Sequence, residues 1–184
     1  CHNHPYETWS QDQFWGLAAF VGRMTQMESF VLADTPGGGF GKGGTGGPGR
    51  PFLHPRTKKE VQPTFLDGTP LPEDKRHDIR MELAKWMTSH PYFGEAAVNR
   101  MWSYFFGRGI VNPVDDFRST NPPTHPELLE ALANDFKRHG FDLKHLMRTI
   151  VQSRAYQLSS VPNETNKEDV INYSHALPRP LDAE

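Results

Sequence analysis

The sequence predicts a mainly α-helical protein: an irregular helical domain with a long Gly- and Pro-rich insertion and at most a short edge strand. Two observations support this prediction. Apolar residues recur at the three- and four-residue spacing of a helix in several segments. The 16 Gly and 16 Pro, by contrast, lie largely outside those segments, and nine of the Gly fall between residues 37 and 49.

The first helix is predicted to begin after Ser10 and to continue to about Val31. Ser10 and Gln13 stand three residues apart, in the S-x-x-Q pattern of a capping box, whose two side chains satisfy free backbone N–H groups. One apolar helix face follows at Phe14, Leu17, Ala18, Val21 and Met24. These signals together predict a helix near the start of the chain.

A Gly- and Pro-rich insertion follows this helix. The Gly run between residues 37 and 49 predicts a flexible loop, because ordering glycine costs more backbone entropy than ordering any other residue. Its Lys42 is followed by Gly43 rather than by Ser or Thr, which argues against a nucleotide-binding P-loop. Prolines interrupt residues 51–72, so residues 60–66 form at most an edge strand.

Further helices are predicted between residues 79 and 151, before a polar tail. Thr124-His125-Pro126-Glu127 predicts a capping box with Pro in the first turn. The other helix ends are predicted at His90-Pro91, at Gly107 or Gly109, at Gly140 and at Asp142. The apolar faces are Ile79, Leu83, Trp86 and Met87; Phe93, Ala97, Met101, Trp102 and Phe105; Leu128, Leu129, Leu132, Ala133 and Phe136; and Leu143, Leu146, Met147, Ile150 and Val151.

Composition excludes several classes of function. Lys and Arg number 20 and Asp and Glu number 22, a formal net charge of −2, so we expect no nucleic-acid partner held by bulk positive charge. No run of about 18 apolar residues occurs, and the sequence therefore predicts no transmembrane helix. The single Cys excludes an internal disulfide framework and a Cys-rich zinc cluster.

Cys1 and His2 are the residues that most suggest a cofactor. In a C-x-x-C-H site two thiols bond to haem c and the adjacent His ligates the iron, and Cys1-His2 matches the last two residues of such a site. His2 and His4 also form a candidate metal pair. The alternative is a terminal Cys that stands beside a His without function, and these two residues taken alone favour it.

Asp115, Asp116, Arg118 and His125 are candidate catalytic residues. Paired carboxylates perform acid–base chemistry where burial separates their pKa values, and Arg118 and His125 would add polar groups to the same cleft. The alternative is structural. One Asp then caps a turn, the other pairs with Arg118 or Arg108, and His125 belongs to the start of a helix.

Two stretches carry a resemblance to one family. The first consists of Cys1-His2-Asn3-His4-Pro5-Tyr6, Trp9, Gln11-Asp12 and Leu17-Ala18-Ala19-Phe20. The second consists of Asn99-Arg100-Met101-Trp102, Phe106-Gly107-Arg108-Gly109-Ile110-Val111, Pro113, Asp115-Asp116-Phe117, His125-Pro126-Glu127-Leu128-Leu129, Leu132-Ala133, Phe136, Lys144, Arg148, Ile150 and Ser153-Arg154-Ala155-Tyr156-Gln157. The first is similar to the end of a planctomycete cytochrome c-associated (PSCyt-type) domain. The second resembles the planctomycete-specific (PSD-type) domain of unknown function that usually follows it.

The resemblance implies a domain division. Residues 1–33 would end the PSCyt-type domain, residues 34–72 would form the Gly/Pro-rich linker or insertion, and residues 73–160 would form the helical core of the PSD-type domain. Residues 161–184 would be an extended polar tail. The chain begins with Cys1 rather than with Met or a signal sequence, so we expect it to be a fragment of a longer protein.

The resemblance also implies an exported bacterial protein, periplasmic or secreted, that carries haem c on Cys1 and His2. Its partner would be a redox protein or a cytochrome domain of the same chain. Three functions are open: c-type haem-associated electron transfer, a hydrolase or oxidase acting on polysaccharide-derived substrates, and a non-catalytic structural or interaction domain. In the third, the residues that lock the helices together would be Asn99, Arg100, Trp102, Asp116 and Arg118.

Overall fold

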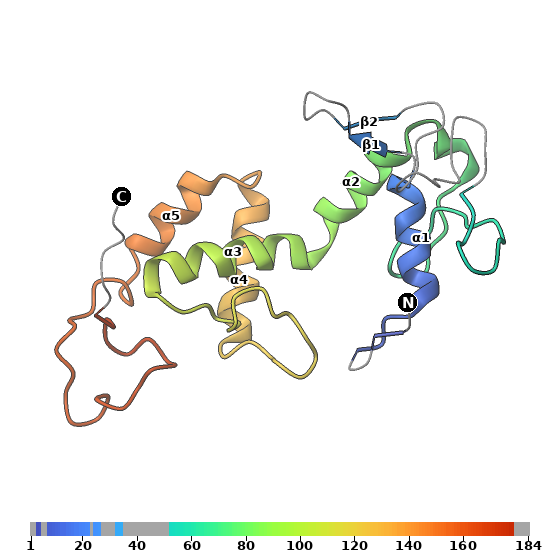
Figure 1. The fold of residues 1–184 in the computed structure, drawn as a ribbon. Coiled ribbons are helices and arrows are strands. Elements are labelled where there is room, and N and C mark those ends of the chain that lie inside the picture. The colour runs from blue at the N-terminus through green and yellow to red at the C-terminus, as the bar shows by residue number, and fades with distance from the viewer. Residues whose placement is uncertain (1–2, 5–6, 23, 27–31, 35–51, 179–184) are drawn as a thin grey trace. The chain divides into compact units, whose positions relative to one another are not determined.

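The structure, a computed structural model, describes residues 3–4, 7–22, 24–26, 32–34 and 52–178 (Figure 1). It confirms the mainly α-helical fold class. The chain forms two compact units, Cys1–Met87 and Thr88–Glu184. The Gly run predicted as a flexible loop at residues 37–49 lies outside the described residues.

Helix α1 (Gln11–Val21) belongs to the first unit and begins with the predicted capping box (Figure 1). Gln13 N donates to Ser10 Oγ over 3.2 Å, and Ser10 N donates to Gln13 Oε1 over 2.8 Å. Each side chain therefore satisfies a backbone N–H that the helix leaves free. The helix does not continue to Val31, however, and that part of the prediction is wrong.

The early end of α1 follows from Gly22. Glycine is a poor helix former, and a Cβ at Gly22 would stand 2.3 Å from Cε2 of Phe52, so this ring occupies the space of a side chain. Beyond it, strand β1 (Met24–Gln26) pairs antiparallel with strand β2 (Leu32–Asp34). Met24 thus extends the helical spacing of apolar residues without belonging to the helix.

Among the described residues of the first unit, two small apolar clusters form the core. Their buried members are Ala18, Ala19 and Phe52 in one cluster and Phe20, Phe65 and Leu71 in the other. The Phe65 ring lies 4.9 Å from that of Phe20 and 5.4 Å from that of Trp86, which belongs to α2 (Ile79–Ser89). A 3₁₀ turn, η1 (Glu73–Asp78), precedes α2.

The described part of the Pro-rich segment, residues 52–72, forms no regular strand. Its pairing consists of isolated bridges, Leu53 with Glu60 and Thr64 with Pro70. This agrees with the prediction of at most an edge strand for residues 60–66, because Pro63 has no N–H to donate to a ladder. Backbone bonds such as Val61 N to Phe52 O, at 2.8 Å, hold the segment instead.

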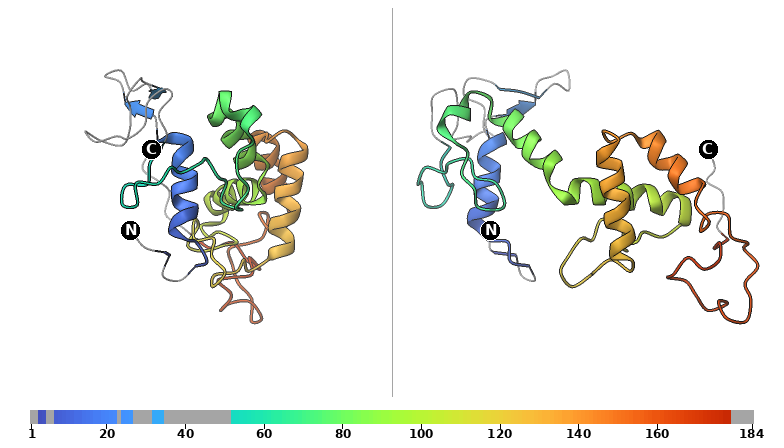
Figure 2. Two further views of the ribbon diagram at one scale, coloured as in Figure 1. Left: turned by 90° about the vertical axis from the view of Figure 1, so that its right-hand side faces the viewer. Right: turned by 180° about the vertical axis from the view of Figure 1, so that it is seen from behind.

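In the second unit, the described residues form three helices: α3 (Pro91–Phe106), α4 (Pro126–Arg138) and α5 (Leu143–Val151). Figures 1 and 2 show α4 running across α3, with α5 following after a short turn. Among the described residues, no helix combines the length and the apolar character that crossing a bilayer requires.

Most ends of these helices lie where the sequence predicts them. His90 precedes α3 and accepts a hydrogen bond from Tyr92 N on its Nδ1, at 3.2 Å. Gly107 ends α3 with φ of 74°, in the left-handed region that glycine adopts at little cost. Asp142 caps α5 and accepts from Lys144 N at 2.8 Å.

The capping box predicted at Thr124 is wrong. The N-cap of α4 is His125, whose side chain makes no capping hydrogen bond. Thr124 instead donates from both its backbone N and its Oγ1 to Ile110 O, at 2.9 and 3.0 Å. Pro126 occupies the first turn as predicted, where its fixed φ favours the helix and its missing N–H costs nothing.

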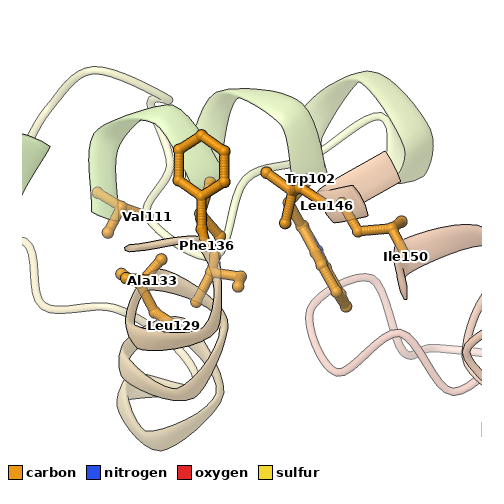
Figure 3. Packing of buried hydrophobic residues seen from close by; sticks show 9 residues of the cluster. Trp102, Val111, Leu129, Ala133, Phe136, Leu146 and Ile150 are labelled. Atoms are coloured by element: carbon orange, nitrogen blue, oxygen red, sulfur yellow. The ribbon is translucent and has the colours of Figure 1, made fainter. Parts of the chain in front are cut away.

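The core of the second unit lies between α3 and the pair α4 and α5. Figure 3 shows Leu129, Ala133 and Phe136 of α4 together with Leu146 and Ile150 of α5 beside α3. The remaining buried members are Val98, Trp102, Ile110 and Val111. Burying side chains of this size stabilises a fold by about 1.5–3 kcal/mol each, so this cluster dominates the stability of the unit.

Asn99 ties the α3–α4 connection (residues 107–125) to α3. This side chain is completely buried. Its Nδ2 donates to Val111 O at 2.9 Å and to Val114 O at 2.7 Å, and its Oδ1 accepts from Val111 N at 2.9 Å. A Cβ at Gly109 would stand 2.9 Å from both Nδ2 and Oδ1 of Asn99, and 2.3 Å from Val111 O. The connection therefore requires the amide of Asn99 and a residue without a side chain at Gly109.

We expect the substitution Gly109→Ala to lower the free energy of unfolding by about 1–3 kcal/mol, the usual cost of forcing an added methyl into a packed interior. The methyl would collide with backbone and with the Asn99 amide, neither of which can rotate away. Urea unfolding followed by circular dichroism measures this change. Gly94→Ala is the matched control, because its Cβ would meet Ala133 only at 3.5 Å and alanine favours a helix. Equal stability of the two variants would contradict the prediction.

Candidate functional site

The candidate catalytic residues Asp115, Asp116 and Arg118 all lie in the α3–α4 connection and are held in ion pairs. Nη2 of Arg100 donates to both carboxylate oxygens of Asp115, at 2.6 and 2.7 Å. Arg118 pairs with Asp116 through Nε and Nη2, each at 2.6 Å. Asp116 therefore pairs with Arg118, as the structural alternative predicted for one of the two Asp residues. Asp115 pairs instead with Arg100, an arginine of α3.

His125, the fourth candidate, lies beside an aromatic cluster rather than among these ion pairs. Its Nδ1 is 3.0 Å from Thr124 Oγ1, and its ring centroid is 5.7 Å from that of Tyr173. The Tyr173 ring in turn meets those of Trp102 and Phe106 at 5.3 and 5.2 Å. Burial raises the pKa of the Tyr173 hydroxyl, so Tyr173 stays neutral and serves this cluster as packing.

Of the candidate cofactor residues at the start of the chain, Cys1 and His2 lie outside the described residues. His4 is exposed; its Nδ1 accepts from Glu7 N at 3.0 Å, and its backbone N donates to Trp9 O at 2.8 Å. The haem c prediction at Cys1 and His2, and the metal prediction at His2 and His4, stay predictions.

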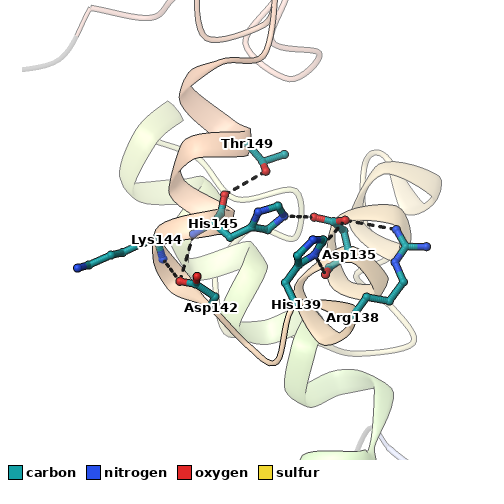
Figure 4. Close-up of polar contacts among 7 residues, drawn as sticks. All are labelled: Asp135, Arg138, His139, Asp142, Lys144, His145 and Thr149. Carbon is teal, nitrogen blue, oxygen red and sulfur yellow. Dashed lines mark hydrogen bonds and ion pairs between the residues drawn. The ribbon is translucent and has the colours of Figure 1, made fainter.

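A cluster that the sequence analysis did not predict lies where α4 meets α5: Asp135, His139 and His145, here called the Asp–His cluster (Figure 4). His145 Nε2 is 2.7 Å from Asp135 Oδ2, and His139 Nδ1 is 3.4 Å from Asp135 Oδ1. The two imidazole rings stack with centroids 3.7 Å apart. One ligand atom from each of the two imidazoles and the carboxylate thus lies within 4.8 Å of the other two.

The turn between α4 and α5 brings these residues together. Asp135 and His139 stand four residues apart at the end of α4, on one helix face. Gly140 and Phe141 then adopt positive φ values of 63° and 62°, and reverse the chain. The Phe141 ring lies 5.3 Å from that of Phe136, which anchors the turn in the core. His145, in the first turn of α5, is thereby directed back at Asp135 (Figure 4).

Asp135 contributes a negative charge to the Asp–His cluster. Its hydrogen bond with His145, followed by that from Arg138, lowers the pKa of the Asp135 carboxyl, which is therefore ionised at neutral pH. His139 and His145 are six residues apart on different elements, so no helical ligand spacing marks them in the sequence. One signal in the sequence could have indicated the cluster: Asp135 and His139 are four residues apart, which places them on one helix face, and Gly140 directly afterwards favours a chain reversal.

A separate cavity of about 330 Å³ opens between α3 and α4. Two carboxylates, Glu95 and Glu130, line it together with His90, Lys137 and Phe141. Burial raises the pKa of Glu95, and the negative charge of Glu130 raises it further. Perturbed carboxyl groups in cavities are characteristic of functional sites, so this cavity is a second candidate site.

Comparison with known proteins finds one family. The model of the PSD1 family, described as a protein of unknown function (DUF1553), matches residues 79–184. No curated protein and no solved structure matches the chain. The match confirms the predicted PSD-type domain of unknown function, whereas the cytochrome c-associated context of residues 1–33 stays a prediction.

We expect Glu95→Gln to raise the melting temperature at pH 7–8 and to lose this advantage below about pH 4. Because the pKa of Glu95 is raised in the folded state, the unfolded state releases its proton first, and folding stability falls as the pH rises from the unfolded pKa through the folded one. Gln carries no charge at any pH and escapes this loss. Thermal unfolding from pH 3.5 to 8 measures the difference. Glu164→Gln, at a side chain that is 95% exposed, is the control, and an identical pH profile for both variants would refute the argument.

Proposed function

The chain belongs to the PSD1 family of proteins of unknown function (DUF1553), and we propose that its second unit, Thr88–Glu184, is a non-catalytic structural module. We further propose that this module serves an exported bacterial protein of the c-type haem-associated, electron-transfer kind. The structural role is argued from the geometry of the unit, and the haem context from the residues at the start of the chain.

One observation carries the structural role: the polar group at the centre of the unit makes its hydrogen bonds to the protein itself. Asn99 is buried, and its Nδ2 and Oδ1 bond to backbone groups of Val111 and Val114. A catalytic amide would need access to a ligand. Asp115 and Asp116 are likewise bound by arginines of the same unit: Asp115 ties the connection to α3 through Arg100, and Asp116 pairs with Arg118 within the connection.

Asn99→Ala should lower the free energy of unfolding by about 3 kcal/mol, because it leaves buried backbone N–H and C=O groups of the connection without partners. Asp115→Asn should change the same quantity by less than about 1 kcal/mol, since its ion pair with Arg100 is exposed. Asn134→Ala, at an exposed asparagine of α4, is the matched control. Urea unfolding gives all three values. A structural lock at Asn99 is excluded if Asn99→Ala is as stable as Asn134→Ala.

The second candidate function is a hydrolase or oxidase acting on polysaccharide-derived substrates. The cavity with Glu95 and Glu130 favours it, because a carboxyl with a raised pKa can act as a general acid beside an ionised carboxylate. Asp115, Asp116, Arg118 and His125 line neither this cavity nor the smaller one beside Tyr173. Release of reducing ends from soluble polysaccharide by the wild-type chain, lost in Glu95→Gln with the fold retained, would favour this candidate over the structural role.

The haem context rests on Cys1, His2 and the segment that follows them. Asn3 Oδ1 accepts from Gln11 N at 2.8 Å, so the residues next to Cys1-His2 are tied to the start of α1. In a c-type site Cys1 would supply one of the two thioether sulfurs and His2 the proximal iron ligand. The second sulfur would come from a Cys upstream of Cys1. A bound haem would supply one-electron redox chemistry.

The test expresses the chain together with its upstream coding sequence in a host that has cytochrome c maturation machinery. We expect a covalent c-type pyridine haemochrome spectrum that Cys1→Ser weakens or abolishes, because the thioether to Cys1 is lost. His4→Ala is the control and should retain the spectrum, since the C-x-x-C-H pattern does not include it. Haem-free protein from a host that matures a reference cytochrome c would overturn the haem context and leave the structural role standing.

A further inference from the structure

We propose that Asp135, His139 and His145 bind one divalent transition-metal ion of the zinc class, joining α4 to α5. One ligand atom from each residue lies within 4.8 Å of the other two. The inference goes beyond the structural role and the haem context, and it depends on neither.

The donor set selects the class of ion. Imidazole nitrogens bind zinc and its first-row neighbours well, whereas calcium and magnesium prefer sites made of oxygen alone. Two imidazoles with one carboxylate are a known zinc-binding combination. The ligand set of the Asp–His cluster therefore points to zinc, cobalt or nickel rather than to a hard cation.

The separations within the cluster are close to those around one bound ion, and the rings of His139 and His145, stacked at an interplanar angle of 20°, must turn to direct both nitrogens at it. Zinc lies about 2 Å from nitrogen or oxygen ligands, which in tetrahedral geometry places neighbouring ligand atoms roughly 3–3.5 Å apart. The contact between His145 Nε2 and Asp135 Oδ2 is 2.7 Å, and that between His139 Nδ1 and Asp135 Oδ1 is 3.4 Å. His139 Nδ1 also lies 2.9 Å from Asp135 O, and binding through this nitrogen exchanges that hydrogen bond for the ion.

The backbone that carries the three residues is fixed by the core and by caps. Leu146, next to His145, is buried, as is Phe136 next to Asp135. Asp142 accepts from the backbone N of His145 at 3.2 Å, and Thr149 Oγ1 donates to His145 O at 3.0 Å. Metal ligands carried by rigid elements lose little entropy on binding, which favours affinity.

The cluster also remains accessible to an ion and to further ligands. The side chains of Asp135 and His145 are each 27% exposed, and that of His139 is 47% exposed. Three protein ligands leave a fourth tetrahedral position, which water or a small anion would fill.

Arg138 is the group that opposes binding. Its Nη2 lies 3.3 Å from Asp135 Oδ1, where the guanidinium competes with an ion for the carboxylate and repels a second positive charge. Removing this charge should therefore strengthen binding through Asp135, while leaving any site that lacks Asp135 unchanged.

Zinc titration of the full chain by isothermal titration calorimetry tests the proposal, with cobalt absorption spectra reporting the geometry. We expect one ion per chain at this site, and a loss of affinity of about tenfold or more for Asp135→Asn and for His145→Gln. Arg138→Gln should bind several-fold more tightly than the wild type. The control His77→Gln, at an exposed histidine outside the cluster, should match the wild type. His4→Gln tests whether zinc binds at the N-terminal candidate pair instead.

Zinc affinity unchanged in both Asp135→Asn and His145→Gln would overturn the proposal, and so would zinc binding lost only in His4→Gln. A second measurement needs no variant: imidazole nitrogen signals in NMR spectra of the wild-type chain during zinc titration. Shifts at His139 and His145 support the site, and shifts confined to other histidines refute it. This keeps the proposal testable even if a substitution unfolds the chain.

Discussion

The long connection between α3 and α4 depends on the carboxamide of Asn99. This side chain makes the hydrogen bonds to the backbone of the connection that neighbouring backbone groups would make in a helix or a sheet. Backbone N–H and C=O groups taken out of water need partners, and an irregular segment has few of its own. Asn99 supplies three hydrogen bonds at one point, to Val111 and Val114. Val111 can then be buried against α3 without leaving its backbone polar groups unpaired.

The position of α4 depends on this arrangement, because the connection leads directly into it. Ile110 O, next to Val111, accepts both hydrogen bonds of Thr124, immediately before the N-cap of α4. Once its start is fixed, α4 contributes to three regions with three faces. Phe136 enters the core, Glu130 lines the cavity shared with α3, and Asp135 belongs to the cluster at α5. One helix thus supports both the packing of the unit and its candidate sites.

The candidate sites differ in how their polar groups are used. The ion pairs of Asp115 and Asp116 are local ties along the surface. In the cavity, Glu95 lies near the like charge of Glu130, an arrangement that costs stability and that packing alone does not require. In the Asp–His cluster, the candidate ligand atoms lie within 4.8 Å of one another, beside the exposed side chain of His139. For a family of unknown function, the second and third regions are therefore where activity or binding is best sought.

The sequence by itself determined the features that depend on neighbouring residues: the mainly helical class, the capping box at Ser10, the end of α3 at Gly107 and the cap of α5 at Asp142. Each is a bond or a φ angle within a few residues, so local chemistry decides it. Where a distant group intervened, local reasoning failed. The Phe52 ring lies against Gly22 at the end of α1, and Ile110 O takes the hydroxyl of Thr124.

Only the tertiary structure decided which side chains meet. Asp115 and Asp116 are adjacent in sequence, yet they pair with arginines of different segments, Arg100 and Arg118. His139 and His145 show no ligand spacing in the sequence, yet their rings stack across a turn. The reason is physical: apolar burial sets the angle between α4 and α5, and polar side chains on the two helices converge wherever that packing places them.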